Sequence, residues 1–158
     1  MTFEAATGRL TTDAGDAIGQ DMTRAAFLDS AIGEHAAVLV ENEPHASWLV
    51  STKLDGRAFR LALYFDGQRL DMLILALDDP AFGTGWESWS RDGELARKAA
   101  HEAWLARLDR SIGEGRNFPW GFVSSIYDER SGGSEIVIRY GARLPERAGP
   151  SIRLVPPG

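Results

Sequence analysis

The chain has 158 residues, a formal net charge of −6 at pH 7 and no cysteine. This length fits one domain with a substantial core. The lack of cysteine excludes disulfides, thiol catalysis, iron–sulfur clusters and cysteine-ligated zinc. The acidic balance argues against nucleic-acid binding, because phosphate contacts need a basic surface.

The sequence predicts neither export nor a membrane partner. Its first residues lack the basic and apolar segments of a secretory signal. The longest apolar run, Met72 to Leu77, is far too short to cross a bilayer. We therefore expect a cytoplasmic protein.

The N-terminal third predicts two strands and a short helix. Phe3 to Thr12 is a candidate edge strand. A helix is expected from Arg24 to Ala31, because Thr23 can cap its first turn and Gly33 follows where a helix stop is typical. The next strand candidate is Ala36 to Val40.

Three runs of alternating hydrophobicity follow, separated by two Asp-Gly pairs. The runs are Trp48 to Leu54, Arg57 to Phe65 and Arg69 to Leu77, and the pairs are Asp55-Gly56 and Asp66-Gly67. Asp-Gly suits both central positions of a type I′ turn, because glycine reaches positive φ freely and aspartate tolerates it. The pattern predicts a three-stranded antiparallel meander with one face on a core and the other partly solvated.

A long helix is expected next, capped by Ser90 or Asp92 and running to about Arg110. At about 100° per residue its apolar residues gather on one arc. That arc comprises Ala96, Ala100, Ala103, Trp104 and Leu108. The polar residues predicted on the opposite side are Glu94, Lys98, Glu102 and Asp109.

A second hairpin is predicted near the C-terminus. Its strands are Phe122 to Asp128 and Glu135 to Tyr140, joined through Ser131-Gly132-Gly133-Ser134. We assign residues 1–141 to a single domain and residues 142–158 to a proline-rich tail. Within that tail Ile152, Leu154 and Val155 are candidates for a short docked strand.

Together these elements predict an α+β fold. Its antiparallel sheet combines the meander with the C-terminal hairpin, and one long and one short helix pack on one face. The short links between strands exclude a parallel sheet, which needs long crossovers.

The sequence does not contain a recognisable catalytic set. Its three histidines lack the spacing of a metal site, its serines lack a nucleophile elbow, and its glycines lack a phosphate-binding pattern. We therefore predict no catalytic residue, no metal and no cofactor. His101 lies on the edge of the predicted apolar arc, where a structural histidine is favoured over a catalytic base.

Tryptophan is the unusual enrichment, with five residues in the chain. Loop tryptophans either seal the end of a core, which is the more common use, or form an exposed surface for a ligand or partner. If such a surface exists here, short loops would bring its members to one end of the sheet. Those members are Trp86, Trp89, Trp120, Tyr127 and Asp128.

One pattern resembles a signature of many small bacterial proteins of unknown function. It is carried by Trp120-Gly121, Ser125-x-Tyr127-Asp128, Gly132-Gly133-Ser134 and the alternation through Ile136, Ile138 and Tyr140. Trp86-Glu-Ser-Trp89, His101-Glu-Ala-Trp104-Leu105 and Phe65-Asp-Gly-Gln-Arg-Leu70 fit the same group. The likeness covers roughly residues 48 to 140 and departs at Glu129-Arg130, where a lysine is expected after Asp128. The resemblance implies a shared fold and no assigned activity.

Three hypotheses about function remain. The first is a binding module that masks a protein partner, as immunity-type proteins do, which the acidity, the small size and the missing catalytic set favour. The second is a protein that binds a small molecule in a cleft lined by its loop tryptophans. The third is a hydrolase or other enzyme that uses His101 with Asp128 or another nearby carboxylate.

Overall fold

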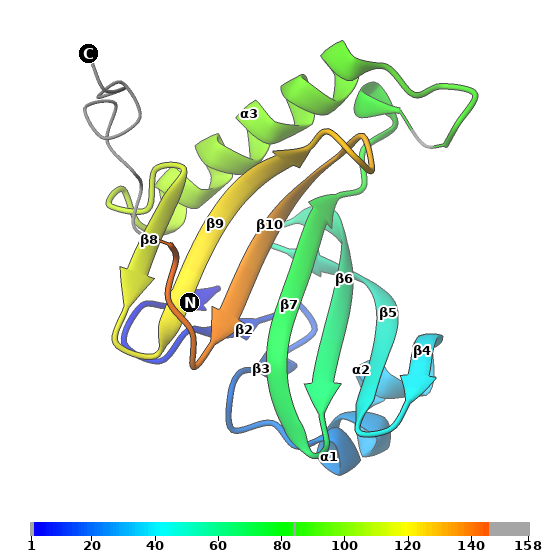
Figure 1. Cartoon of the computed structure of the whole chain (residues 1–158), viewed down its shortest axis with the longest axis vertical. Helices are drawn as coiled ribbons and strands as arrows, with labels where there is room; N and C mark the ends of the chain where they lie inside the picture. Colours follow the sequence, from blue (N-terminus) through cyan, green and yellow to red (C-terminus); the bar gives the residue numbers. More distant parts are fainter. Residues whose placement is uncertain (1, 84, 146–158) are drawn as a thin grey trace, which may run out of the picture.

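The computed structural model describes residues 2–83 and 85–145, which form a three-stranded and a seven-stranded antiparallel sheet with helices (Figure 1). The α+β class and the antiparallel pairing predicted from sequence are confirmed. The large sheet has the order β4-β5-β6-β7-β10-β9-β8. Its strands are β4 (Ala37–Asn42), β5 (His45–Leu54), β6 (Arg57–Asp66), β7 (Arg69–Leu77), β8 (Gly115–Phe118), β9 (Gly121–Asp128) and β10 (Gly133–Tyr140).

The N-terminal segment forms a small sheet of its own rather than the single edge strand expected. Its strands are β1 (Phe3–Glu4), β2 (Arg9–Thr11) and β3 (Ala17–Ile18). The chain reverses at Gly8, which has φ +74° and lies so close to Trp120 that a Cβ would be 2.7 Å from its ring. Glycine is therefore required at this turn, and the turn divides the predicted strand.

The predicted short helix is divided in two, α1 (Arg24–Asp29) and α2 (Ala31–Glu34). Thr23 caps α1 as expected, accepting the Ala26 N–H at 3.1 Å. Gly33 does not end the helix, which corrects the sequence prediction. It lies inside α2, where a Cβ would come within 1.9 Å of the Phe27 carbonyl oxygen, so close packing explains this glycine.

The meander is present, and its two turns differ. Asp55 and Gly56 both have positive φ, 54° and 76°, as a type I′ turn requires. In the second turn Asp66 pairs with Arg69, so Gly67 and Gln68 are the central residues. Only Gly67 has positive φ, which is the pattern of a type II′ turn, so the type I′ turn predicted with Asp66 and Gly67 at its centre is wrong.

The long helix α3 (Arg91–Leu108) follows a 3₁₀ turn, η1 (Pro80–Phe82). Ser90 caps it and accepts the Gly93 N–H at 2.9 Å, which confirms one of the two predicted caps. The helix ends two residues before the predicted Arg110 and packs against β7, β9 and β10.

The predicted buried face of α3 is correct in part, because Trp104 is buried and Ala100 and Leu108 pack against the core. Ala96 and Ala103, which were placed on the apolar arc, are exposed, and Glu94, which was placed opposite, is buried. The buried residues are Glu94, Arg97, His101, Trp104 and Leu105. The buried face could not be predicted from the apolar residues alone, because polar side chains of α3 also face the sheet. These side chains form hydrogen bonds to the ends of neighbouring strands.

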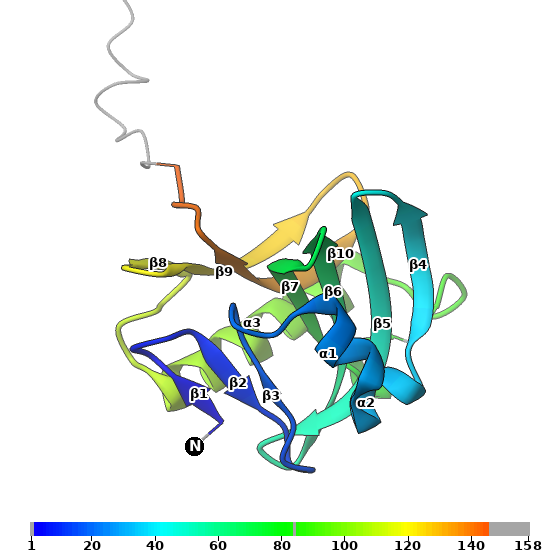
Figure 2. The same cartoon turned by 90° about the horizontal axis from the view of Figure 1, so that it is seen from below.

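The two faces of the large sheet have different surroundings. One face carries the core, including Trp48, Phe59 and Leu61, and the small sheet, α1 and α3 lie on this side (Figure 2). Side chains of the opposite face, including Ala62 and Ile74, pair across neighbouring strands. Within the described residues no helix packs on that opposite face, which leaves it available for a site.

The last described residues lie along β8, where the Leu144 N–H donates to Asn117 Oδ1 at 2.8 Å. The tail strand proposed around Ile152, Leu154 and Val155 lies outside the described residues. None of the helices in the described part of the chain has the length and hydropathy needed to cross a membrane.

Candidate functional site

A cavity of about 370 Å³ opens on the second face of the sheet, beside the turn between β9 and β10. Side chains of the central strands form its floor, and Gly83, Gly85, Trp86 and Trp89 of the loop with the β9–β10 turn form its walls. Figure 1 shows the turn next to the loop that leads into α3. The charged, aromatic and turn residues of its lining include Arg60, Tyr64, Trp86, Trp89, Glu94, Arg97, Gly132 and Glu135.

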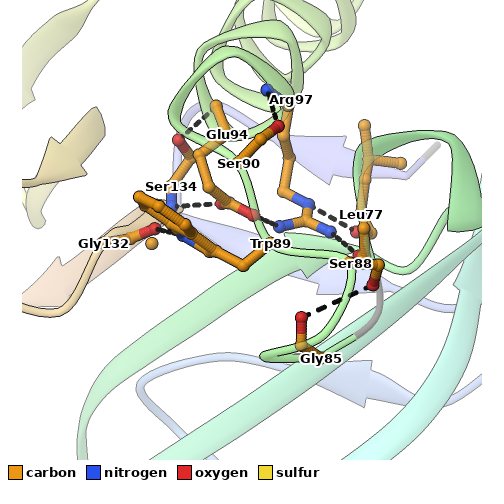
Figure 3. Close-up of polar contacts among 12 residues, drawn as sticks. Leu77, Gly85, Ser88, Trp89, Ser90, Glu94, Arg97, Gly132 and Ser134 are labelled. Carbon is orange, nitrogen blue, oxygen red and sulfur yellow. Dashed lines mark hydrogen bonds and ion pairs between the residues drawn. The ribbon is translucent and has the colours of Figure 1, made fainter.

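Trp86 and Trp89 line this cavity in different ways. The Trp89 Nε1–H donates to the Gly132 carbonyl at 2.7 Å, which fixes the indole against the turn (Figure 3). Gly132 has φ +72°, and a Cβ there would lie 3.1 Å from Trp89 Nε1. Trp86 is 87% exposed, the highest value among the large hydrophobic residues described. Trp89 is thus part of the wall, and Trp86 offers its ring to solvent.

Tyr127 and Asp128 lie at the same end of the sheet. The Arg91 guanidinium lies 5.7 Å from the centre of the Tyr127 ring, within cation–π range. The Asp128 carbonyl accepts the Gly132 N–H at 2.7 Å, and its Oδ1 accepts the Arg130 N–H at 2.9 Å. The structure therefore brings Tyr127 and Asp128 close to Trp89 through the turn, outside the cavity lining.

Trp120 does not belong with these residues, which corrects the sequence prediction. It is 7% exposed, stacks on Phe118 at 5.0 Å between ring centres, and donates its Nε1–H to the Ala5 carbonyl at 2.7 Å. Trp120 directly precedes β9, whereas Asp128 ends that strand, so the length of β9, about 23 Å at 3.3 Å per residue, separates the two. Of the two roles considered for the loop tryptophans, Trp120 has the first, because it closes one end of the core. Trp86 is exposed at the surface.

A buried ion pair supports the inner wall of the cavity. Arg97 Nη1 pairs with Glu94, and both side chains are almost fully buried (Figure 3). Arg97 Nε donates to the Leu77 carbonyl at 3.1 Å and Nη2 to the Gly83 carbonyl at 2.8 Å. Glu94 Oε1 accepts the Ser134 N–H at 2.9 Å. The pair thereby ties α3 to the end of β7, to the loop at Gly83 and to the start of β10.

His101 is fully buried one turn further along α3. Its Nε2 accepts the Leu77 N–H at 3.0 Å, which assigns the ring proton to Nδ1. Burial, followed by the nearby charges of Arg97 and Arg57, lowers the pKa of His101 to about 3. A neutral imidazole with its acceptor nitrogen occupied and no exposure has a structural role. It does not suit the proton transfer that the hydrolase hypothesis assigned to it.

Glu135 is the residue that sequence analysis missed. It is half-buried in the cavity, and burial, followed by the charge of Asp128, raises its pKa. In the described part of the chain no cationic side chain forms an ion pair with it. Because side chains alternate along a strand, Glu135 lies on the face of the sheet opposite to Ile136, which is in the core. The burial of Glu135 depends on loops that are distant in sequence, so the strand pattern alone could not show it. Within residues 2–83 and 85–145, moreover, no three histidine, aspartate or glutamate side chains gather to hold a metal ion.

Neither a protein-family model nor a curated protein matches this sequence. The fold is similar to a chain in a solved structure, "Rhs1-CT in complex with cognate immunity protein RhsI1". The TM-score is 0.60 at 14% identity, over 88% of this chain and 86% of that one. At this identity the likeness is one of fold.

Proposed function

We propose that the chain is a protein-binding module of the immunity type, which masks a partner protein through the surface around Trp86. The observation that carries the proposal is the 87% exposure of Trp86 at the mouth of a cavity. A large aromatic ring left in water loses the stabilisation that burial provides, and tryptophan is enriched among the residues that dominate protein interfaces. Binding a partner would cover this ring.

The fold likeness supports the same proposal. The solved structure that this chain resembles is a complex between Rhs1-CT and a cognate immunity protein, so each protein in that complex binds the other. A net charge of −6 favours a partner with a basic surface, because complementary charge steers association. The cytoplasmic, bacterial setting and the resemblance to small bacterial proteins are part of this proposal.

The experiment uses the protein encoded beside this chain's gene in its source genome. An immunity role predicts that this neighbour, or its C-terminal domain, stops bacterial growth when expressed alone. Co-expression of the full chain should restore growth, and the two purified proteins should form a complex in size-exclusion chromatography. A neighbour that is harmless and does not bind would contradict the proposal.

A small-molecule role is the second candidate, because the cavity volume of about 370 Å³ lies within the range of ligand pockets. A ligand of this kind would be retained by the folded protein. Native mass spectrometry of protein purified from the source organism should then give a mass above that of the chain. A mass equal to that of the chain would contradict this second candidate.

A further inference from the structure

We propose that the cavity beside Trp86 receives a cationic side chain, a lysine or an arginine, from the partner protein, with Glu135 as its counter-charge. The inference rests on the proposed function, because it names the chemical group of the partner that enters the site.

Glu135 is the half-buried charged group of the cavity lining that forms no ion pair within the described residues. The other acidic residue of the lining, Glu94, is neutralised by Arg97 and accepts the Ser134 N–H. Arg97 has its Nε, Nη1 and Nη2 groups occupied, so it has little left to offer Glu135. Arg60 also lines the cavity, but it is exposed and forms no ion pair within the described residues.

A half-buried carboxylate without a counter-charge is unfavourable, since its burial removes water and nothing replaces it. The same burial and the charge of Asp128 keep the pKa of Glu135 raised. The charge of Glu135 in turn helps to raise the pKa of Tyr64, after burial, so that tyrosine stays neutral in the cavity. A cation that enters would restore the missing interaction for Glu135.

The aromatic walls suit the same ligand. Trp86, Trp89 and Tyr64 all line the cavity, and tryptophan is the best ring for binding an ammonium or guanidinium group. The hydrogen bond from Trp89 to Gly132 holds one of these rings in place before any ligand arrives. Preorganised rings beside a carboxylate form a site in which both features attract positive charge.

Other occupants fit less well. An apolar side chain would complete the burial of Glu135 and leave its charge unpaired, which is costly. An anion could pair with Arg60, but it would have to lie beside Glu135 in the same cavity. A cation is therefore the group that the lining favours, and the acidic chain would attract a basic partner in any case.

The test is a titration of the full chain with N-acetylarginine methylamide, which represents an arginine side chain within a protein. Binding is followed by the ¹H–¹⁵N NMR signals of the Trp86 and Trp89 indoles. The neutral control is the citrulline analogue, in which a urea replaces the guanidinium at nearly the same shape. We expect a saturable shift with the arginine probe and about tenfold weaker binding with the citrulline probe.

Two variants distinguish the effect of the Glu135 charge in the cavity from the effect of the net charge of the protein. Glu135→Gln should weaken the arginine probe about tenfold, because it removes the counter-charge. Glu41→Gln makes the same charge change at an exposed residue of β4, outside the cavity lining, and should leave binding unchanged. Equal binding of the two probes, unchanged binding by Glu135→Gln, or no shift with any probe would each overturn the proposal.

Free arginine distinguishes the source of the cation. Tighter binding of free arginine than of the capped probe would mean a free amino acid is the ligand, which would overturn the assignment to a partner side chain. The titration uses no partner protein. Its failure would therefore leave the proposed masking role intact, and a failed growth rescue would leave the cation site intact.

Discussion

Two tryptophan substitutions separate core sealing from surface function, Trp120→Ala and Trp86→Ala. Both remove an indole ring, and both tryptophans lie in connections between elements, Trp86 between η1 and α3 and Trp120 between β8 and β9. Trp120 is 7% exposed and stacked on Phe118, whereas Trp86 is 87% exposed. The substitution is the same in both variants, so any difference in the free energy of unfolding comes from how deeply each ring is buried.

The expected magnitudes follow from the buried area. A tryptophan side chain offers about 200–250 Å², so Trp120 buries about 200 Å² and its loss costs up to about 5 kcal/mol at 25 cal/mol per Å². Measured tryptophan truncations in cores cost about 3–5 kcal/mol. Trp86 buries only about 30 Å² by the same arithmetic, so its loss should cost less than about 1 kcal/mol.

Urea unfolding followed by far-ultraviolet circular dichroism measures both values on the full chain. We expect a midpoint far below that of the wild type for Trp120→Ala and a nearly unchanged midpoint for Trp86→Ala, with similar slopes. If Trp86→Ala lost about as much stability as Trp120→Ala, Trp86 would be a core residue, and the reasoning about an exposed surface would be refuted.

Three further outcomes are expected. Gly67→Val places a β-branched residue at φ +61° and should cost about 1–3 kcal/mol, so an unchanged urea midpoint would refute the turn assignment. Glu135→Gln should stabilise the protein at pH 7, because a raised carboxyl pKa means that the folded state disfavours the charged form. That gain in stability should shrink as the pH falls towards 4.5, the ordinary pKa of glutamate, because the carboxyl of Glu135 in the wild type then becomes neutral. Thermal denaturation at several pH values tests this expectation. The pKa of His101 is lowered from 6.5 to about 3, so the wild type should lose about 1.4 kcal/mol of stability per pH unit below 6.5 through this residue. His101→Gln should show a shallower loss in urea unfolding between pH 6.5 and 5, and an identical slope would contradict the assignment.

The antiparallel sheet was predictable because its signals are local. Asp55-Gly56 forms the expected type I′ turn, and the alternation from Arg57 to Phe65 corresponds to β6. Turn chemistry and period-2 alternation depend only on neighbours in sequence. The short helix was also found by its cap at Thr23, although Gly33 was given the wrong role because its reason is a close contact with Phe27.

The buried face of α3 and the site were predictable only in part, because they depend on contacts between distant residues. Arg97 looks like a solvent-facing residue until the carbonyls of Leu77 and Gly83 are placed around it. Trp86 and Trp120 look alike in sequence, and contacts with the N-terminal segment, Phe118 and Tyr140 explain why Trp120 is buried. The burial of Glu135 comes from the loop and the central strands that surround it.

The most direct test of the proposed interface around Trp86 is the affinity of this chain for the protein encoded beside its gene, measured by isothermal titration calorimetry. Trp86→Ala should weaken binding by at least about thirtyfold, as removal of a central interface residue does. Leu28→Ala, which also truncates an exposed hydrophobic residue but lies on α1, should change the affinity by less than about threefold. Wild-type affinity in Trp86→Ala would contradict the claim that this chain binds its partner through the surface around Trp86.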